Sequence, residues 1–464
     1  MEISKTVDHF FHLADNGTTV CRELRGGAVT FMTMCYIIFV QRAVLGSEPP
    51  MGAGMDPQAV VVVTCLVAAI GTLIMGLAAN YPIALAPCMG ENFYFVTVAG
   101  MTVGGVLVGW QTALAAVFFS GLIFLFLSAF RFREAVFESI PDSLKYAISA
   151  GIGIFIALIG MQRAGIITVN KFTGISLGNL HDPQIILAIF GLLITSILFV
   201  WRVRGAFMWG ILITSAAGLI MTSVFNAAGM KNITLIQYKG LVAAPPSIAP
   251  IFGKIDIRGL LNLAMIPIII VFLIMVLFDT VGTLVGVGTQ AGLLRDGKLP
   301  RIGKALIADA TATTAGAFMG SSTVSSYIES AAGVADGART GLANMMTAFL
   351  FLLAIFFTPL VEMIGGGAGK GGLFLPAVAP VMILVGSLMM KSITRIDWSD
   401  PTDGIPAFLV IIGIPFSYNI AYGIGFGFVI HPLVKLVSGR GNEVRWLCYT
   451  LGAVFLIYFA FLLH

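Results

Sequence analysis

Apolar residues run along the chain in long blocks separated by short polar connections. A helix needs about 20 mostly apolar residues to cross a bilayer. Ten uninterrupted blocks reach or approach this length, at 27–46, 59–79, 102–130, 143–162, 185–201, 206–229, 260–293, 341–361, 373–390 and 445–463. Three further windows, at 81–100, 303–336 and 404–437, are apolar but interrupted by Gly, Pro and Ser, and these predict short, paired or broken helices. Blocks and windows together predict about thirteen to fifteen membrane segments.

Composition removes the alternative of a soluble protein. Of the 464 residues 58% are hydrophobic and 10% charged, with a mean hydropathy of +0.99, whereas ordinary globular chains carry about 25% charged residues. Most of the surface must therefore face lipid. The basic residues cluster in short connections, such as Arg202 and Arg204, where they set membrane orientation. Because no basic stripe carries interleaved polar readout residues, we expect no nucleic-acid partner.

The two halves of the chain, 1–258 and 259–464, show a weak internal repeat. In each, a helix rich in small residues leads to a short extended piece and then to a half-helix, at 83–92 and again at 320–329. Paired interruptions at matching places are the best sequence indication of a transporter binding site. The alternative is two surface loops that happen to look alike. Both readings stay open from the sequence alone.

Acidic residues stand in several of the apolar stretches. Asp279 is the only charge between 259 and 294, and Glu329 follows the second extended piece. Ionisable groups in membrane segments are costly and usually face a cavity on an ion or substrate path. We expect this role for both. Glu91 could instead lie near an interface, and Asp309, close to Lys304, is expected to be a helix-terminal or packing acid.

The residues around these acids suggest the kind of ligand. Thr283 is four residues beyond Asp279 and shares its helix face, and Gly282 and Gly286 should allow a neighbouring helix to approach closely. Carboxylates accept hydrogen bonds from ring N–H groups, and aromatic residues such as Phe93 can stack on a ring. The set suits a planar heterocycle rather than an anion, which would require Arg, Lys or helix N-termini.

The five cysteines show no metal-ligand spacing, so the sequence predicts neither a disulfide nor a metal. We also expect no cofactor. His431, beside a predicted membrane edge, is interpreted as an interfacial histidine rather than a proton relay.

At these residues the chain resembles a known family. Five runs closely resemble signatures of the AzgA-like purine permeases, within the nucleobase:cation symporter-2 (nucleobase–ascorbate transporter) family. The runs are 321–342 (SSTVSSYIESAAGVADGARTGL), 278–284 (FDTVGTL), 30–40 (TFMTMCYIIFV), 84–92 (ALAPCMGEN) and 401–408 (PTDGIPAF). The resemblance extends over nearly the whole chain, and the first run is highly specific.

The resemblance implies an all-α polytopic fold of fourteen transmembrane segments in two inverted repeats of seven. It also implies a core domain that holds the substrate, a gate domain, an elevator-like step and a homodimer in the cytoplasmic (inner) membrane. The implied substrates are adenine, guanine, hypoxanthine or xanthine, with the proton as coupling ion. Asp279 and Glu329 fall on the family's binding-site acids. Five other residues fall near positions that line the family's site, and these are Thr33, Asn92, Phe93, Thr283 and Ser326.

On this basis the sequence predicts proton-coupled uptake of a purine base. Glu329 would accept from the ring N–H groups, and Asp279 is the first choice for the coupled proton, because a neutral acid crosses the bilayer at lower cost than a carboxylate. Either acid could hold that proton. Glu91 is a third candidate, since the family usually carries an apolar residue at that position and often Gly at Cys88.

Two other functions remain as alternatives. One is a permease for uracil or another heterocycle on the same fold. The other, more remote, is a membrane-embedded enzyme, for which the sequence offers no catalytic constellation and no nucleotide-binding loop.

Overall fold

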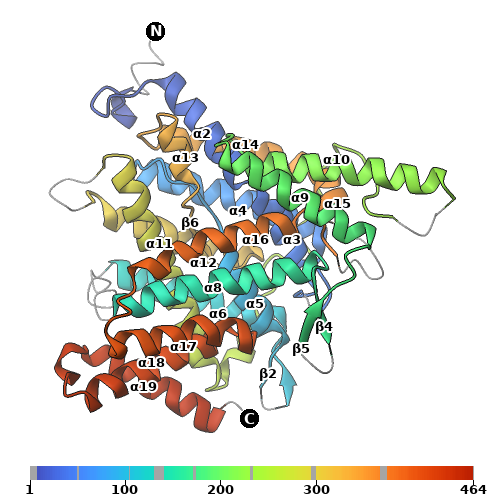
Figure 1. Cartoon of the computed structure of the whole chain (residues 1–464). Coiled ribbons are helices and arrows are strands. Elements are labelled where there is room, and N and C mark those ends of the chain that lie inside the picture. The colour runs from blue at the N-terminus through green and yellow to red at the C-terminus, as the bar shows by residue number, and fades with distance from the viewer. Residues whose placement is uncertain are drawn as a thin grey trace.

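The computed structural model describes residues 8–49, 52–103, 105–129, 141–170, 174–229, 234–293, 299–365 and 374–462. Within these ranges the chain is mostly helical, with three short antiparallel strand pairs (Figure 1). Three of the predicted blocks include residues outside these ranges: 104 and 130 in the block 102–130, 373 in the block 373–390, and 463 in the block 445–463.

Nine helices of the described chain are long and apolar enough to cross a membrane. Eight of them coincide with predicted blocks, and the ninth, α18, comes from the interrupted window 404–437. The blocks at 373–390 and 445–463 form shorter helices. The helices are α2 Val20–Met34, α3 Tyr36–Leu45, α4 Pro57–Ala78, α5 Met89–Gly100, α6 Gly109–Ala129, α8 Asp142–Arg163, α9 Pro183–Val200, α10 Ala206–Ala227, α11 Met265–Gln290, α12 Ile302–Met319, α13 Ser330–Ala335, α14 Leu342–Ala354, α15 Thr358–Gly365, α16 Ala379–Met389, α17 Pro401–Ser417, α18 Ile420–Val437 and α19 Trp446–Ile457.

The two interrupted segments meet in the middle of the molecule. Strand β1 (Leu85–Pro87) leads into α5, and β6 (Val324–Ser326) leads toward α13. The strands pair antiparallel, with Leu85 opposite Ser326 and Pro87 opposite Val324, and every strand residue is buried. This confirms the predicted order of helix, extended piece and half-helix, and it excludes the reading as surface loops. Because the strands pair with each other, non-helical backbone can exist at membrane depth.

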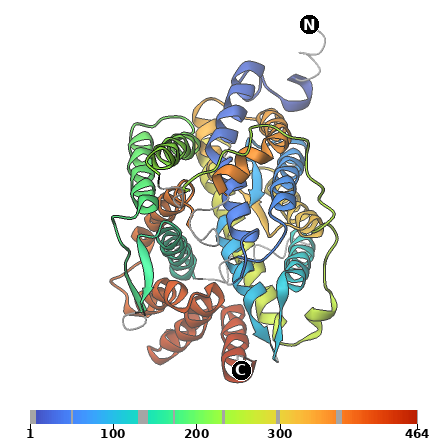
Figure 2. The same ribbon diagram turned by 90° about the vertical axis from the view of Figure 1, so that its right-hand side faces the viewer.

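The helices form two groups (Figure 2). One group, α2–α6 with α11–α14, surrounds β1 and β6. In the other, α8 packs against α16 and α17, while α9 packs against α10. A Cβ atom on Gly386 of α16 would lie only 2.4 Å from the carbonyl oxygen of Gly153 on α8, so these helices are in close backbone contact.

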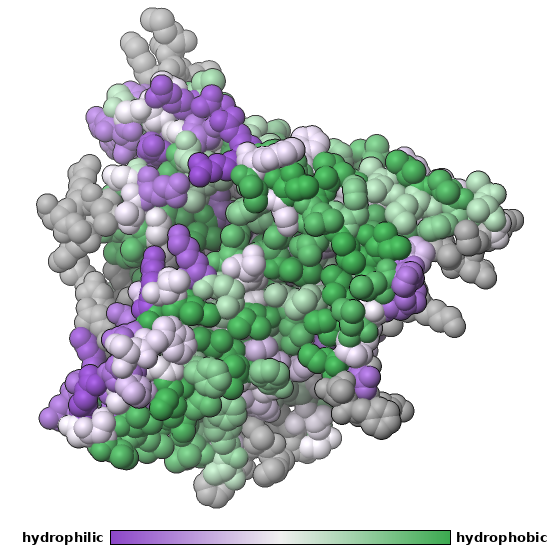
Figure 3. All heavy atoms as spheres, viewed as in Figure 1, coloured by the Kyte–Doolittle hydropathy of each residue, from purple (hydrophilic) through white to green (hydrophobic). Residues whose placement is uncertain are grey.

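The outer face of the second group is apolar. Leu193 on α9 and Ile220 and Val224 on α10 are each more than half exposed, and apolar side chains extend over these helices in Figure 3, while polar ones gather near the N-terminus. A surface of this kind is stable against lipid rather than water.

Two expectations from the sequence were wrong. The block predicted at 102–130 does not begin as a helix, because it opens with a β-hairpin, β2 (Thr102–Val103) and β3 (Val106–Leu107), and α6 starts only at Gly109. Another hairpin, β4 (Ile167–Asn170) and β5 (Gly174–Leu177), lies between α8 and α9. A Cβ atom at Gly282 or Gly286 would meet nothing within 4 Å among the described residues. These glycines therefore face open space and do not mediate helix packing in the described chain.

Candidate functional site

Asp279 lies on α11 where this helix passes β6. Its Oδ2 atom accepts hydrogen bonds from the Ser325 hydroxyl and from the Cys88 thiol, the latter at 3.3 Å. Ser325 belongs to β6, and Cys88 follows β1 as the N-cap of α5. Asp279 is therefore held by one residue of β6 and by the residue that directly follows β1. Its side chain stays partly accessible.

Glu329 is the residue that precedes α13, and it faces α2 and α3. Its Oε1 atom accepts from the Tyr36 hydroxyl at 2.6 Å, and its carbonyl oxygen lies 3.3 Å from the Thr33 hydroxyl. Tyr36 therefore fixes one oxygen of the carboxylate and orients the other. Asp279 and Glu329 lie close enough to interact electrostatically. The two predicted acids thus lie near each other, with Asp279 bound to Ser325 of β6 and Glu329 just beyond the end of this strand.

Neighbouring serines on β6 point in opposite directions. Ser325 donates to Asp279, whereas Ser326 donates to Asp309 Oδ2 at 2.9 Å. This is the alternation of side chains expected along an extended strand. Asp309 lies in the interior of α12 and is fully buried. Of the two roles expected for Asp309, the helix-terminal one was therefore wrong, whereas the role of a packing acid is confirmed by its burial and its contact with Ser326.

Asn92 belongs to a closed polar cluster. Its amide nitrogen donates to Gln41, its oxygen accepts from Ser322, and Gln41 also donates to Ser322 at 3.2 Å. All three residues are buried. The amide of Asn92 is therefore occupied by protein partners and joins α3, α5 and the segment before β6.

Phe93 and Thr283, the two remaining residues predicted for the site, are both buried. Phe93 on α5 packs edge-to-face against Phe155 of α8, with ring centroids 6.1 Å apart, at the border between the two helix groups. Thr283 lies one turn beyond Asp279 on α11 and is 5% exposed.

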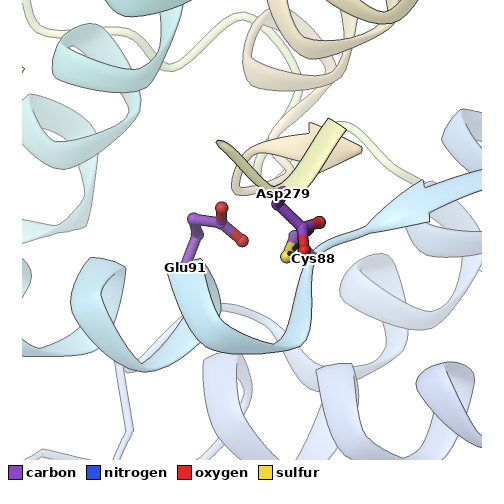
Figure 4. A group of neighbouring side chains, drawn as sticks. All are labelled: Cys88, Glu91 and Asp279. Carbon is purple, nitrogen blue, oxygen red and sulfur yellow. Dashed lines mark hydrogen bonds between the residues drawn. The ribbon is translucent and has the colours of Figure 1, made fainter. Parts of the chain in front are cut away.

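Glu91 does not lie at an interface. It is in the first turn of α5 and 2% exposed, and its carboxylate is turned toward Asp279 and Cys88 (Figure 4). His431 on α18 is 2% exposed, and its Nε2 atom lies 3.1 Å from Asp403 Oδ1. Together with charged residues such as Lys435 and Glu443 it lines a pocket at the end of α18, and its position at a membrane edge stays a prediction.

Sequence reasoning missed the hydrogen-bond partners of the two acids, which are Tyr36, Cys88 and Ser325. All three lie within the family-like runs 30–40, 84–92 and 321–342, but the acids that they contact lie in other parts of the chain. Only the period-two alternation of an extended piece could have separated Ser325 from Ser326 in advance.

Comparisons with known proteins agree with this architecture. Residues 22–426 match the family model Xan_ur_permease, described as a Permease family. A putative permease of Methanocaldococcus jannaschii is 44% identical and covers 99% of both chains. A guanine/hypoxanthine permease of Bacillus subtilis is 41% identical, covering 98% of this chain and 99% of its own. An adenine permease of Escherichia coli is 39% identical, covering 97% and 96%.

Among solved structures, the transmembrane domain of a cyanobacterial bicarbonate transporter is similar, with a TM-score of 0.61 and 13% sequence identity, covering 86% of this chain and 96% of its own. At that identity the likeness concerns the fold alone. The family match and the relatives confirm the resemblance found in the sequence. This chain therefore belongs to the Permease family, as a nucleobase:cation symporter-2 protein of the AzgA-like type, and is a multi-pass transporter of the cell membrane rather than an enzyme.

Proposed function

We propose that this permease takes up purine nucleobases, namely adenine, guanine, hypoxanthine or xanthine, together with protons. The observation that carries the proposal is the pair Asp279 and Glu329, whose carboxylates accept hydrogen bonds from Ser325 and Tyr36 respectively. Two acceptors at fixed positions suit the N–H edge of a planar heterocycle. The names of the relatives, which are guanine/hypoxanthine and adenine permeases, support a purine.

In this mechanism Glu329 binds the base and Asp279 contributes a second contact and holds the coupled proton. Moving a charged carboxylate through the bilayer is expensive. A proton on Asp279 makes the loaded site less charged during the crossing, and its release on the cytoplasmic side would loosen the base. Ser325 and Cys88 can donate to the carboxylate while the base is absent.

The proposed architecture has fourteen segments in two inverted repeats. With α2 and α3 as one segment, and α14 and α15 as another, the elements from α2 to α10 supply seven and those from α11 to α18 supply seven more. A matching pair of hydrogen bonds supports the repeat. Thr72 of α4 donates to the carbonyl of Leu85 in β1, and Thr313 of α12 donates to that of Val324 in β6.

We assign the group around β1 and β6 to the core and the group containing α8–α10 and α16–α18 to the gate. An elevator-like movement of the core along the gate would carry the acids across the membrane. The apolar outer face of the chain leaves room for a homodimer, which chemical cross-linking in the membrane would detect.

Uptake of radiolabelled bases into proteoliposomes, with and without an inward proton gradient, tests the function. We expect gradient-dependent accumulation of at least one purine, and loss of accumulation in Asp279→Asn and Glu329→Gln. The matched control is Glu48→Gln, an exposed acid outside the site. Accumulation of uracil alone would favour the pyrimidine alternative. Full purine accumulation in either site variant would refute the role given to that acid.

A further inference from the structure

A group of three potential ligands lies beside the proposed binding site. The Cys88 sulfur and one carboxylate oxygen from each of Glu91 and Asp279 all lie within 4.8 Å of one another. Cys88 and Glu91 come from the start of α5, and Asp279 comes from α11 (Figure 4). No spacing in the sequence predicts this group, because α11 is nearly two hundred residues away.

A second observation indicates that the group is incomplete. The Oε2 atom of Glu91 is buried and has no hydrogen-bond partner within the described part of the chain. The side chain is 2% exposed and aimed at the other two residues. A buried carboxylate without a partner is costly, and two carboxylates close together repel each other. A cation between them would remove both costs.

We propose that Cys88, Glu91 and Asp279 form a site for a thiophilic divalent cation, such as Zn²⁺ or Cd²⁺. One sulfur and two carboxylate oxygens are a donor set for such ions, whereas Mg²⁺ and Ca²⁺ require oxygen ligands. From Zn–S and Zn–O bonds of about 2.3 and 2.0 Å, a tetrahedral ion would hold its sulfur and oxygen ligands about 3.5 Å apart. The 3.3 Å between Cys88 Sγ and Asp279 Oδ2 is close to that separation.

The chemistry of loading is a simple exchange. The thiol of Cys88 now donates its hydrogen to Asp279. On binding, the S–H bond breaks, the sulfur keeps the electron pair and binds the cation, and the proton leaves to solvent. Ser325 can keep its hydrogen bond to Asp279 and so orient this carboxylate. Of the three residues only Asp279 is not fully buried, so an ion would reach the site from its side.

A bound ion would occupy the carboxylate that the proposed mechanism needs for its proton and substrate. We therefore expect bound metal to inhibit purine uptake competitively, with an affinity in the micromolar range or tighter. This expectation about uptake rests on the proposed function. Metal binding itself does not rest on it, since it requires only the three side chains.

The test is a titration of the purified full-length protein in detergent with Cd²⁺ alone. We expect one ion per chain by equilibrium dialysis, together with the ultraviolet absorption of a cadmium–thiolate bond. Cys88→Ser should abolish the absorption, and Glu91→Gln should weaken binding by more than about tenfold, since even supporting groups of metal sites contribute that much. Cys21→Ser is the matched control, because Cys21 is an exposed thiol away from the site.

Several results would overturn the proposal. These are no thiolate absorption in the wild-type protein, absorption that persists in Cys88→Ser, absorption lost only in Cys21→Ser, or unchanged affinity in Glu91→Gln. Gel filtration and circular dichroism establish that each variant is folded. If purine uptake is never observed but cadmium binds as described, the proposed function fails while the metal site stands. If uptake occurs and cadmium does not bind, the metal site alone is wrong.

Discussion

Replacing Gly333 by alanine would push α13 away from α2 and disturb Glu329. A Cβ atom at Gly333 would lie 2.1 Å from the Thr30 hydroxyl oxygen and 2.4 Å from the carbonyl oxygen of Gly26. Ordinary contacts begin at 3.4 Å, so the two helices must separate by about 1 Å, and such overpacking typically costs about 1–3 kcal/mol. The same shift would lengthen the 2.6 Å hydrogen bond between Tyr36 and Glu329 beyond bonding range.

Losing that hydrogen bond to a charged group costs about 1.5–3 kcal/mol, which corresponds to a roughly tenfold or greater loss of affinity for the base. We therefore expect Gly333→Ala to lower the thermal unfolding midpoint in detergent and to reduce purine uptake at least about tenfold. Gly286→Ala on α11 is the control, because its Cβ meets nothing within 4 Å among the described residues, and alanine is favoured over glycine in a helix. A Gly333→Ala protein with wild-type midpoint and uptake would refute the reasoning, as would equal losses in both variants.

Three further predictions concern polar contacts. Asn92→Ala should destabilise the protein by about 1–3 kcal/mol, measured as a lower unfolding midpoint, because two buried partners lose their hydrogen bonds. Arg204→Ala removes an ion pair with Asp336 that joins the two helix groups; since Arg204 is mostly exposed, we expect less than about 1 kcal/mol, or up to about a fivefold change in uptake rate. Arg440 holds the pKa of Glu443 below its ordinary value by hydrogen bonding, so Arg440→Ala should be less stable than wild type at pH 7.

The acid dependence of the last prediction has a definite sign. A carboxyl group whose pKa is lowered by folding contributes stability above its unfolded pKa, about 4.3 for Glu, and loses it as the pH falls through the folded value. The difference between wild type and Arg440→Ala in unfolding midpoint should therefore shrink below about pH 4. A constant difference across pH would contradict this assignment. An unchanged midpoint for Asn92→Ala, or a large loss of stability for Arg204→Ala, would contradict the other two.

Some of the site was accessible from the sequence because its signals are local. Asp279 and Glu329 stand out as charges in apolar stretches, and a charge at membrane depth implies a cavity wherever its partners lie. The extended pieces at β1 and β6 were visible through their Pro, Gly and Ser content. Their pairing confirmed that reading.

Other features depended on contacts that no local pattern encodes. The sequence left open whether Glu91 lies near an interface, and it placed Asp309 near a predicted membrane face because Lys304 is close to it in the chain. Both are buried instead, since α5 and α12 are covered by neighbouring helices from elsewhere in the chain.

The sequence by itself determined that the chain lies in a membrane, where most spans run, which two segments are broken and that Asp279 and Glu329 are candidate site acids. Each of these follows from hydrophobicity or chain-breaking residues within a window of about one helix. The tertiary structure alone decided which partners those acids meet. Tyr36 reaches Glu329 across 293 residues, and Cys88 reaches Asp279 across 191. Such contacts arise because β1 pairs with β6 and α13 packs against α2, which brings segments from the two halves of the chain together.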